Sequence, residues 1–247
     1  MNIEDILQSP PRYKDIVTAY GLDVRGGDLQ LTPGGNIALT VDGLDLKWGN
    51  DRVNATHRLI QRWCFNAPTL AGLFKLVTHA RTAKQQLTDE MNRVAPIAFQ
   101  NTRAIQRFHD INNEVGASTF GSEACAGAVM VVLHNLLMRY KIDLNATKKK
   151  WEKSSPQIGA RSFGSIIAAG AANFRHHDEW ARCNPPSDQQ LQSIEVIAAA
   201  LKQPIAPNGK GHPFRGNVCP QLLEVLSDGD FEELSRRFFA FAKDLAS

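Results

Sequence analysis

Apolar residues recur at helical spacing over most of this chain. Asp51 is a residue type that caps helices, and the apolar positions after it predict a helix ending near Trp63. A second helix should begin at Pro68, because proline suits a first helical turn. Its pattern continues to Val94, where Pro96 should kink or break it. We therefore expect two helices in this region rather than one.

The second half of the chain has the same character. Residues 123–140 are apolar almost all round, so we expect a central helix that is buried on most sides. Ser162 should begin another helix, and Pro185-Pro186 should stop it. Asp228-Gly229-Asp230 should cap the last one. Further helices are expected over residues 97–111 and 189–201, with loops over 112–118, 143–160 and 204–217.

Residues 23–48 differ from the rest, because polar and apolar residues alternate loosely there. Two such runs, 28–32 and 36–41, are separated by the strong turn signal Pro33-Gly34-Gly35. Asp42-Gly43 marks a second turn before residues 44–48. The expected fold is therefore mostly α: a helical bundle over residues 51–247, preceded by a segment, residues 1–50, with a small β-hairpin or three-stranded meander.

Composition and charge narrow the function only slightly. Of the 247 residues, 43% are hydrophobic and 21% are charged, which is ordinary for a globular protein. A net charge of +3 permits a nucleic-acid partner without indicating one. The four cysteines form no CxxC pair, no signal peptide is evident, and the longest apolar stretch, 124–133, is too short to cross a bilayer. We expect a cytoplasmic protein with no membrane partner, no cofactor and no metal.

The densest chemistry in the chain is AANFRHHDEW, residues 171–180. On a helix, Asn173, His176 and Trp180 form a row beside the apolar face. His176 could act as a general acid or base, Arg175 could stabilise a phosphate, and Asn173 could hold one. Trp180 could stack on a base, with His177 near the edge of the site. The alternative is purely structural, because such groups also close helix C-termini.

This segment resembles a motif of one branch of the HEPN superfamily, the higher-eukaryote and prokaryote nucleotide-binding domains. That motif is Ala-Asn, two residues, then Lys-His-Arg-Asp-Glu-Trp. In this chain Arg175 stands at the Lys position, with one residue rather than two after Asn173, and His177 replaces the Arg; the matching residues are Ala172, Asn173, His176, Asp178, Glu179 and Trp180. The resemblance covers roughly residues 83–182.

The resemblance implies a four- to five-helix bundle that forms a homodimer with its groove on the two-fold axis. It also implies binding of RNA or a nucleotide, and for many members metal-independent ribonuclease activity in bacterial defence or toxin–antitoxin systems. The best-known catalytic signature of the superfamily, Arg then His after four to six residues, is missing from this helix. It occurs instead as Arg103–His109 and Arg52–His57, at a spacing that chance also produces.

Other residues could contribute to the same site. Glu123 and His134 share a stripe of the expected central helix and could face a groove beside residues 171–180, although an isolated histidine in an apolar helix is more often a core residue. A basic segment containing Lys149, Lys150 and Trp151 could bind phosphates and stack on a base, and Arg215 belongs to a second basic loop. Such loops are more often simply solvated.

Two other functions stay open. One is a non-enzymatic interaction or structural module, either a subunit of a defence complex or a phage-related part; the run from Asp28 to Gly35 resembles an Asp-Leu-x-Leu-Thr-Pro-x-Gly motif of phage baseplate wedge proteins. The other is a metal-dependent phosphohydrolase of the HD type, suggested by His109-Asp110 and His177-Asp178. No phosphate-binding P-loop and no GxSxG nucleophile motif is present.

Overall fold

Helices make up most of the computed structural model, which describes residues 2–25, 29–40, 43, 45–98 and 100–247. The elements, in chain order, are α1 (Ile3–Gln8), α2 (Tyr13–Tyr20), α3 (Asp51–Ala98), α4 (Thr102–Asp143), α5 (Lys148–Lys153), β1 (Gln157–Ile158), β2 (Arg161–Ser162), α6 (Phe163–Arg182), α7 (Asp188–Ala200), α8 (Cys219–Ser227) and α9 (Phe231–Ala246). The expectation of a mostly α fold is confirmed.

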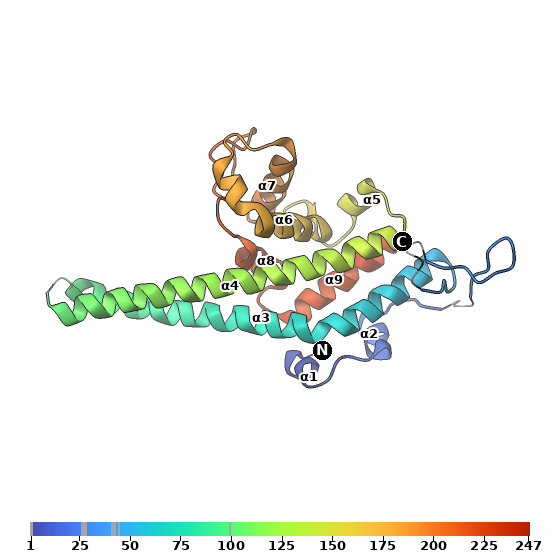
Figure 1. Ribbon diagram of the computed structural model, residues 1–247, viewed down its shortest axis with the longest axis horizontal. Coiled ribbons are helices and arrows are strands. Elements are labelled where there is room, and N and C mark those ends of the chain that lie inside the picture. Colours follow the sequence, from blue (N-terminus) through green and yellow to red (C-terminus); the bar gives the residue numbers. More distant parts are fainter. Residues whose placement is uncertain (1, 26–28, 41–42, 44, 99) are drawn as a thin grey trace.

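The central feature is an antiparallel hairpin of two very long helices, α3 and α4 (Figure 1). Asn50 caps the start of α3, where Asp51 was expected to do so, by accepting from the Val53 backbone N–H at 2.9 Å. Asn101 caps α4 in the same way, accepting from Ala104 at 2.8 Å. Between these caps the chain changes direction once.

Two of the expected interruptions within this hairpin are wrong, because Pro68 lies inside α3 and residues 112–118, expected to be a loop, are part of α4. The expected break at Pro96 is confirmed to within two residues, since α3 ends at Ala98. A proline removes one backbone hydrogen bond, but Ala67 and Leu70 beside Pro68 are fully buried. Packing on both sides of the proline therefore keeps the helix continuous.

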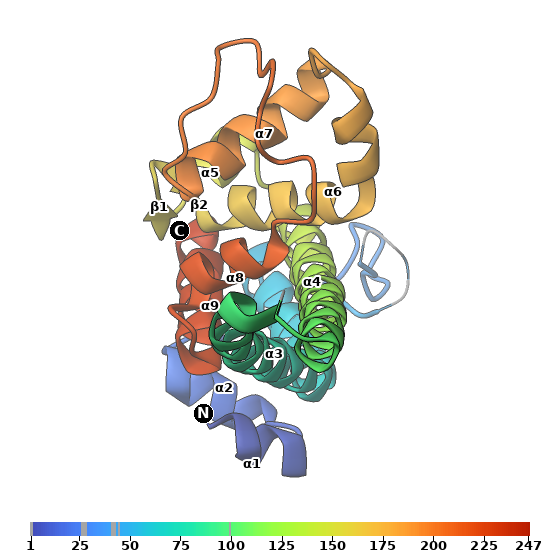
Figure 2. The same cartoon turned by 90° about the vertical axis from the view of Figure 1, so that its left-hand side faces the viewer.

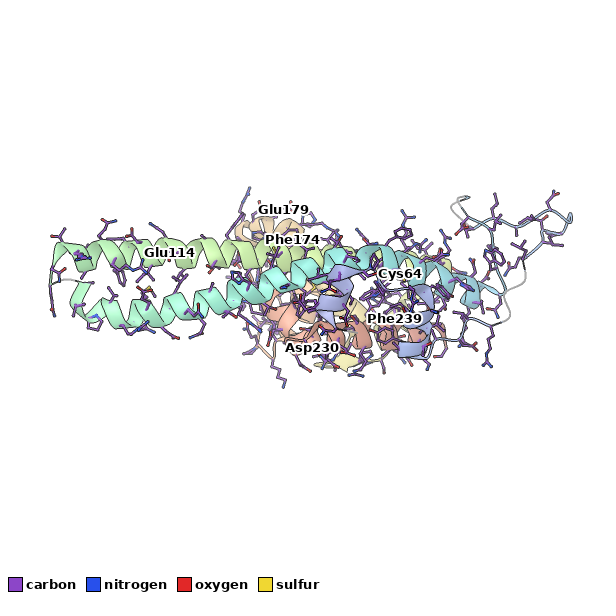
Figure 3. All side chains as sticks on the ribbon, turned by 90° about the horizontal axis from the view of Figure 1, so that it is seen from below. Cys64, Glu114, Phe174, Glu179, Asp230 and Phe239 are labelled. Carbon is purple, nitrogen blue, oxygen red and sulfur yellow. The ribbon has the colours of Figure 1, made fainter. Side chains whose placement is uncertain are left out.

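The distal half of the hairpin extends well beyond the other helices (Figure 1). Figure 3 places Glu114 on this part of α4, away from the body of the protein. Its side chains pack mainly across the α3–α4 seam, where Ile111 is fully buried, while Phe120 stays exposed. Much of the segment assigned to the HEPN-like region, from residue 83 onward, is therefore a two-helix projection.

The body of the protein has three layers around the proximal half of the hairpin (Figure 2). One side carries α6 and α7, the other carries α1 and α2, and α9 lies beside α3 and α4. A Cβ on Gly127 of α4 would lie 1.9 Å from the ring of Phe174, so this glycine lets α6 approach α4 closely. On the other side of the hairpin, Trp63 of α3 packs against Phe238 and Phe239 of α9.

Several local expectations are confirmed. Ser162 caps α6, which ends at Arg182 just before the two prolines, and Asp230 caps α9. The expected loop over residues 143–160 is wrong in part, since it contains α5 and a short hairpin in which Gln157 pairs with Ser162. The helices α1, α2 and α8 were not expected.

The segment after α2 has three short extended stretches joined by single bridges, and the first stretch also bridges the third. It therefore departs from the expected hairpin or meander, in which the outer strands would not pair; we refer to it as the meander. The bridges join Leu29 to Trp48, Leu31 to Ile37, and Leu39 to Leu46, all antiparallel. Residues 26–28, 41, 42 and 44, which the expected strands and turns include, lie outside the described residues.

One described helix, α4, includes an 18-residue window apolar enough to cross a membrane by length and composition, and 44% of that window is buried inside the fold. The core helix of a folded protein passes the same test.

Candidate functional site

The side chain of Asn173 has a structural role in this fold. It is completely buried. The amide oxygen accepts from the Val218 backbone N–H at 2.9 Å, and the amide nitrogen donates to the Gly216 carbonyl oxygen at 3.2 Å. Because both ends of the amide are bonded to the backbone of one loop, Asn173 fastens that loop onto α6 and is closed off from a phosphate.

The two tryptophans assigned to base stacking are also buried. Trp180 is 2% exposed. The Trp151 ring packs edge-on against Phe241, with the Lys141 ammonium over it at 5.4 Å from the ring centroid. In the structure, neither ring presents an exposed face on which a base could stack.

Arg175 and His176 are exposed on the outer side of α6. Arg175 reaches across to α4, where its Nη2 lies 3.4 Å from Nδ1 of His134. His176 Nδ1 lies 3.3 Å from a carboxylate oxygen of Glu179, whose outward position Figure 3 shows. Burial, followed by the positive charge of Arg175, lowers the pKa of His134, which favours its neutral form. His134, which the sequence left open as a core residue or as part of a groove, therefore lies beside Arg175 of residues 171–180.

The loop fastened by Asn173 brings other candidate residues to the same region. Arg215 is exposed on this loop, two residues from the Asn217 side chain, which donates to the Glu123 backbone carbonyl at 2.9 Å. Glu123 thus contributes its backbone here. His177 is half-buried, and its Nδ1 has no hydrogen-bond partner among the described residues.

The first basic segment lies elsewhere. Lys149 and Lys150 belong to α5, whose Trp151 packs against Gly164 near the start of α6. At 1.5 Å per residue, α6 separates Gly164 from His176 by roughly 18 Å. The two sets of positive side chains expected to act together therefore belong to opposite ends of α6.

The two pairs that match the Arg-to-His spacing of the HEPN signature, Arg103–His109 and Arg52–His57, lie outside this region. Arg103 and His109 are exposed on the distal half of α4, in the projecting hairpin. His57 is held at the other end of the molecule, where its Nδ1 lies 2.5 Å from the Tyr13 hydroxyl. The structure does not bring either pair to residues 171–180.

The residues that would bind metal in an HD-type enzyme are dispersed. His109-Asp110 lies on the distal part of α4 and His177-Asp178 on the last turns of α6. Within the described ranges, no three His, Cys, Asp or Glu side chains gather into a group that could hold a metal ion.

The meander shows an unusual feature that sequence reasoning passed over. Residues paired across an antiparallel bridge, and residues two apart on one strand, point to the same face. The bridged positions therefore carry six large apolar side chains on the same side of the backbone. This apolar meander face consists of Leu29, Leu31, Ile37, Leu39, Leu46 and Trp48, which are 36–62% exposed.

The opposite face of the meander is polar and turned towards the protein. Thr40 is buried, and Lys47 pairs with Asp51 at 3.5 Å. Both residues line a cavity of about 330 Å³ against α3 and the end of α4, where Asp143 binds Arg58 at 3.1 Å. The usual order is inverted, since the polar side chains are sheltered and the apolar ones face solvent. The alternation in the sequence contained this signal, but not which face would point outwards.

Comparison with known protein families, curated proteins and solved structures finds no match to this chain.

Proposed function

We propose that the protein is a non-enzymatic interaction module whose apolar meander face binds a protein partner. The observation that supports this is the inverted orientation of the meander. Six of the thirteen exposed large apolar side chains among the described residues lie on this one short segment. A contiguous apolar patch on an otherwise polar surface is typical of an interaction site.

The partner we propose is a second copy of this chain. Most oligomers of soluble proteins are symmetric assemblies of one chain, in which the same patch meets itself. The patch has no charged side chain among its six members, so it needs no complementary charge. A stable interface buries about 800 Å² on each partner, which is more than six half-exposed side chains supply. We therefore expect a dimer of about micromolar affinity.

Sedimentation velocity tests this proposal directly. The wild-type protein should shift from monomer to dimer between about 1 and 100 µM. The double variant Leu31→Thr with Leu39→Thr should stay monomeric, because it removes apolar surface while keeping β-favouring residues.

The matched control is Phe65→Gln, which removes an 87% exposed aromatic side chain from α3 outside the meander. This variant should dimerise like the wild type. A wild-type protein that stays monomeric throughout, or a double variant that dimerises equally well, would contradict the proposal.

The second candidate function is RNA binding at the outer side of α6, in line with the HEPN resemblance. The observation that favours it is the exposed pair Arg175 and His176 on α6, with the partly buried His134 of α4 beside Arg175. If RNA is also cleaved there, His176 is the acid or base and Arg175 stabilises the charged phosphate. Nearby carboxylates limit the positive charge, because Asp178 pairs with Arg182 and Glu179 faces His176.

Incubation of the purified protein with mixed RNA tests the second candidate. His176→Ala should abolish cleavage, and Arg175→Ala should weaken binding. Lys149→Gln, on α5 at the other end of α6, serves as the control for a general loss of positive charge. Cleavage or binding that survives both α6 substitutions would remove this surface from the function.

A further inference from the structure

A polar cavity of about 490 Å³ lies between the end of α4, α5, β2, α6 and α7. It shares no residue with the apolar meander face or with residues 173–180. Its walls contain Lys141, Lys148, Trp151, Glu152, Arg161, Ser165, Ala168, Ala169, Gln189, Gln192, Ser193, Glu195 and Val196.

The facing surfaces of α6 and α7 keep this cavity open. Gln189, Gln192 and Ser193 recur at helical spacing on α7, so they share one face. Opposite them, α6 presents Ser165 and Ala168. Helix seams are normally filled by large apolar side chains. Here small residues and amides leave a space lined with hydrogen-bonding groups.

Positive charge enters the cavity from three separate elements. Lys141 comes from α4, and Arg161 from β2; neither has an ion-pair partner within the part of the chain that the structure describes. Lys148 comes from α5 and lies at the rim, where its Nζ is 3.7 Å from a carboxylate oxygen of Glu152. Glu195 from α7 also lines the cavity, which leaves a net positive charge.

Two close approaches fix the elements beside Lys141 and Arg161. A Cβ on Gly164 would lie 2.7 Å from the Trp151 ring, so this ring packs tightly against α6, and the Lys141 ammonium lies 5.4 Å from the ring centroid. A Cβ on Gly159 would lie 2.1 Å from the Ala199 carbonyl oxygen, so the β1–β2 turn sits directly on α7. The turn therefore holds the backbone of Arg161 beside the cavity.

We propose that this cavity binds the phosphate monoester of a small polar molecule. The guanidinium of Arg161 and the ammonium of Lys141 bind the phosphate, since a guanidinium matches its geometry with paired donors. The glutamine amides and Glu195 accept and donate hydrogen bonds to the hydroxyl or amine groups of the rest of the ligand. This site is independent of the proposed docking function.

Isothermal titration with four probes tests the site on the full-length protein. The probes are inorganic phosphate, ribose 5-phosphate, adenosine 5′-monophosphate and ribose. Both monoesters should bind with a Kd below about 1 mM, phosphate more weakly, and ribose not at all. Raising the salt concentration should weaken binding.

Two exposed residues provide matched variants. Arg161→Gln should weaken monoester binding about tenfold, the loss expected for one charge-assisted contact. Lys149→Gln, on α5 but outside the cavity lining, should bind within about twofold of the wild type. Unchanged thermal melting of both variants confirms that they fold. Absence of monoester binding, binding of phosphate alone with equal strength, or full binding by Arg161→Gln would overturn the proposal.

Discussion

Asn173 and His176 lie on neighbouring turns of α6, yet the fold gives them opposite environments. Asn173 is sealed under a loop with both ends of its amide bonded, and His176 is exposed beside Glu179. Helical spacing placed both residues in one polar row of the helix. It gives the side of the helix on which a residue lies, but not which distant segment covers that side. The 204–217 loop provides that cover, and no local pattern predicts its path.

Alanine substitution separates these two environments. Asn173→Ala should lower the free energy of unfolding by about 2–3 kcal/mol, because it leaves the Val218 N–H and the Gly216 carbonyl without partners. His176→Ala should change it by less than about 1 kcal/mol, since exposed pairs contribute little. Urea denaturation of both variants measures the difference, and equal losses would contradict the assignment.

Histidine burial should make the protein less stable in mild acid. Burial lowers the pKa of His57, His134 and His212. Each of these histidines therefore binds a proton less readily in the folded protein than in the unfolded chain. Its contribution to the free energy of unfolding is complete above the ordinary histidine pKa of about 6.5 and is lost as the pH falls below that value. Most carboxyl groups titrate lower, near pH 4.

The melting temperature should accordingly fall between about pH 7 and pH 5. His134→Gln should show a smaller decrease over that interval, because one of the three groups is gone. A melting temperature that rises on acidification, or an unchanged slope in the variant, would refute this explanation.

At the scale of elements, the type of structure followed from periodicity, but the continuity of α3 and α4 did not. Pro68 and Pro96 are local signals for a break, and tertiary burial around Ala67 and Leu70 outweighs the first of them. Capping residues predicted helix starts more reliably than prolines predicted breaks, because Ser162 and Asp230 bind backbone groups of their own first helical turn. The short helices α1, α2 and α8 were missed although each has a local signal: Asn2 caps the start of α1, Gly21 ends α2 in the left-handed conformation, and Pro220 lies in the first turn of α8.

Two glycines on α4 test the packing of that helix against α6. Gly127→Ala should destabilise the protein by about 1–3 kcal/mol, because the new methyl group would overlap the Phe174 ring. Gly116→Ala lies on the same helix with nothing within 4 Å of the new Cβ, and should stabilise the protein by about 0.5–1 kcal/mol. Calorimetry that gives both changes the same sign would show that α6 does not approach α4 as described.

At the scale of the whole molecule, the chain combines a compact body, a projecting helical hairpin and an outward-facing apolar meander (Figure 1). The sequence predicted the mostly α architecture and the place of the meander. It did not predict that the distal hairpin would leave the body or that the meander would turn its polar side inwards. Both depend on how segments far apart in sequence pack together, which the periodicity of one segment does not encode.

The most direct test of the docking proposal is the accessibility of Trp48. The chain has four tryptophans, and Trp63, Trp151 and Trp180 are all buried, whereas Trp48 is 41% exposed on the apolar meander face. Acrylamide quenching of tryptophan fluorescence therefore reports chiefly on this face. Our account predicts that quenching decreases as the wild-type concentration rises through the dimerisation range, and stays constant for Leu31→Thr with Leu39→Thr. Constant quenching of the wild type at every concentration would contradict it.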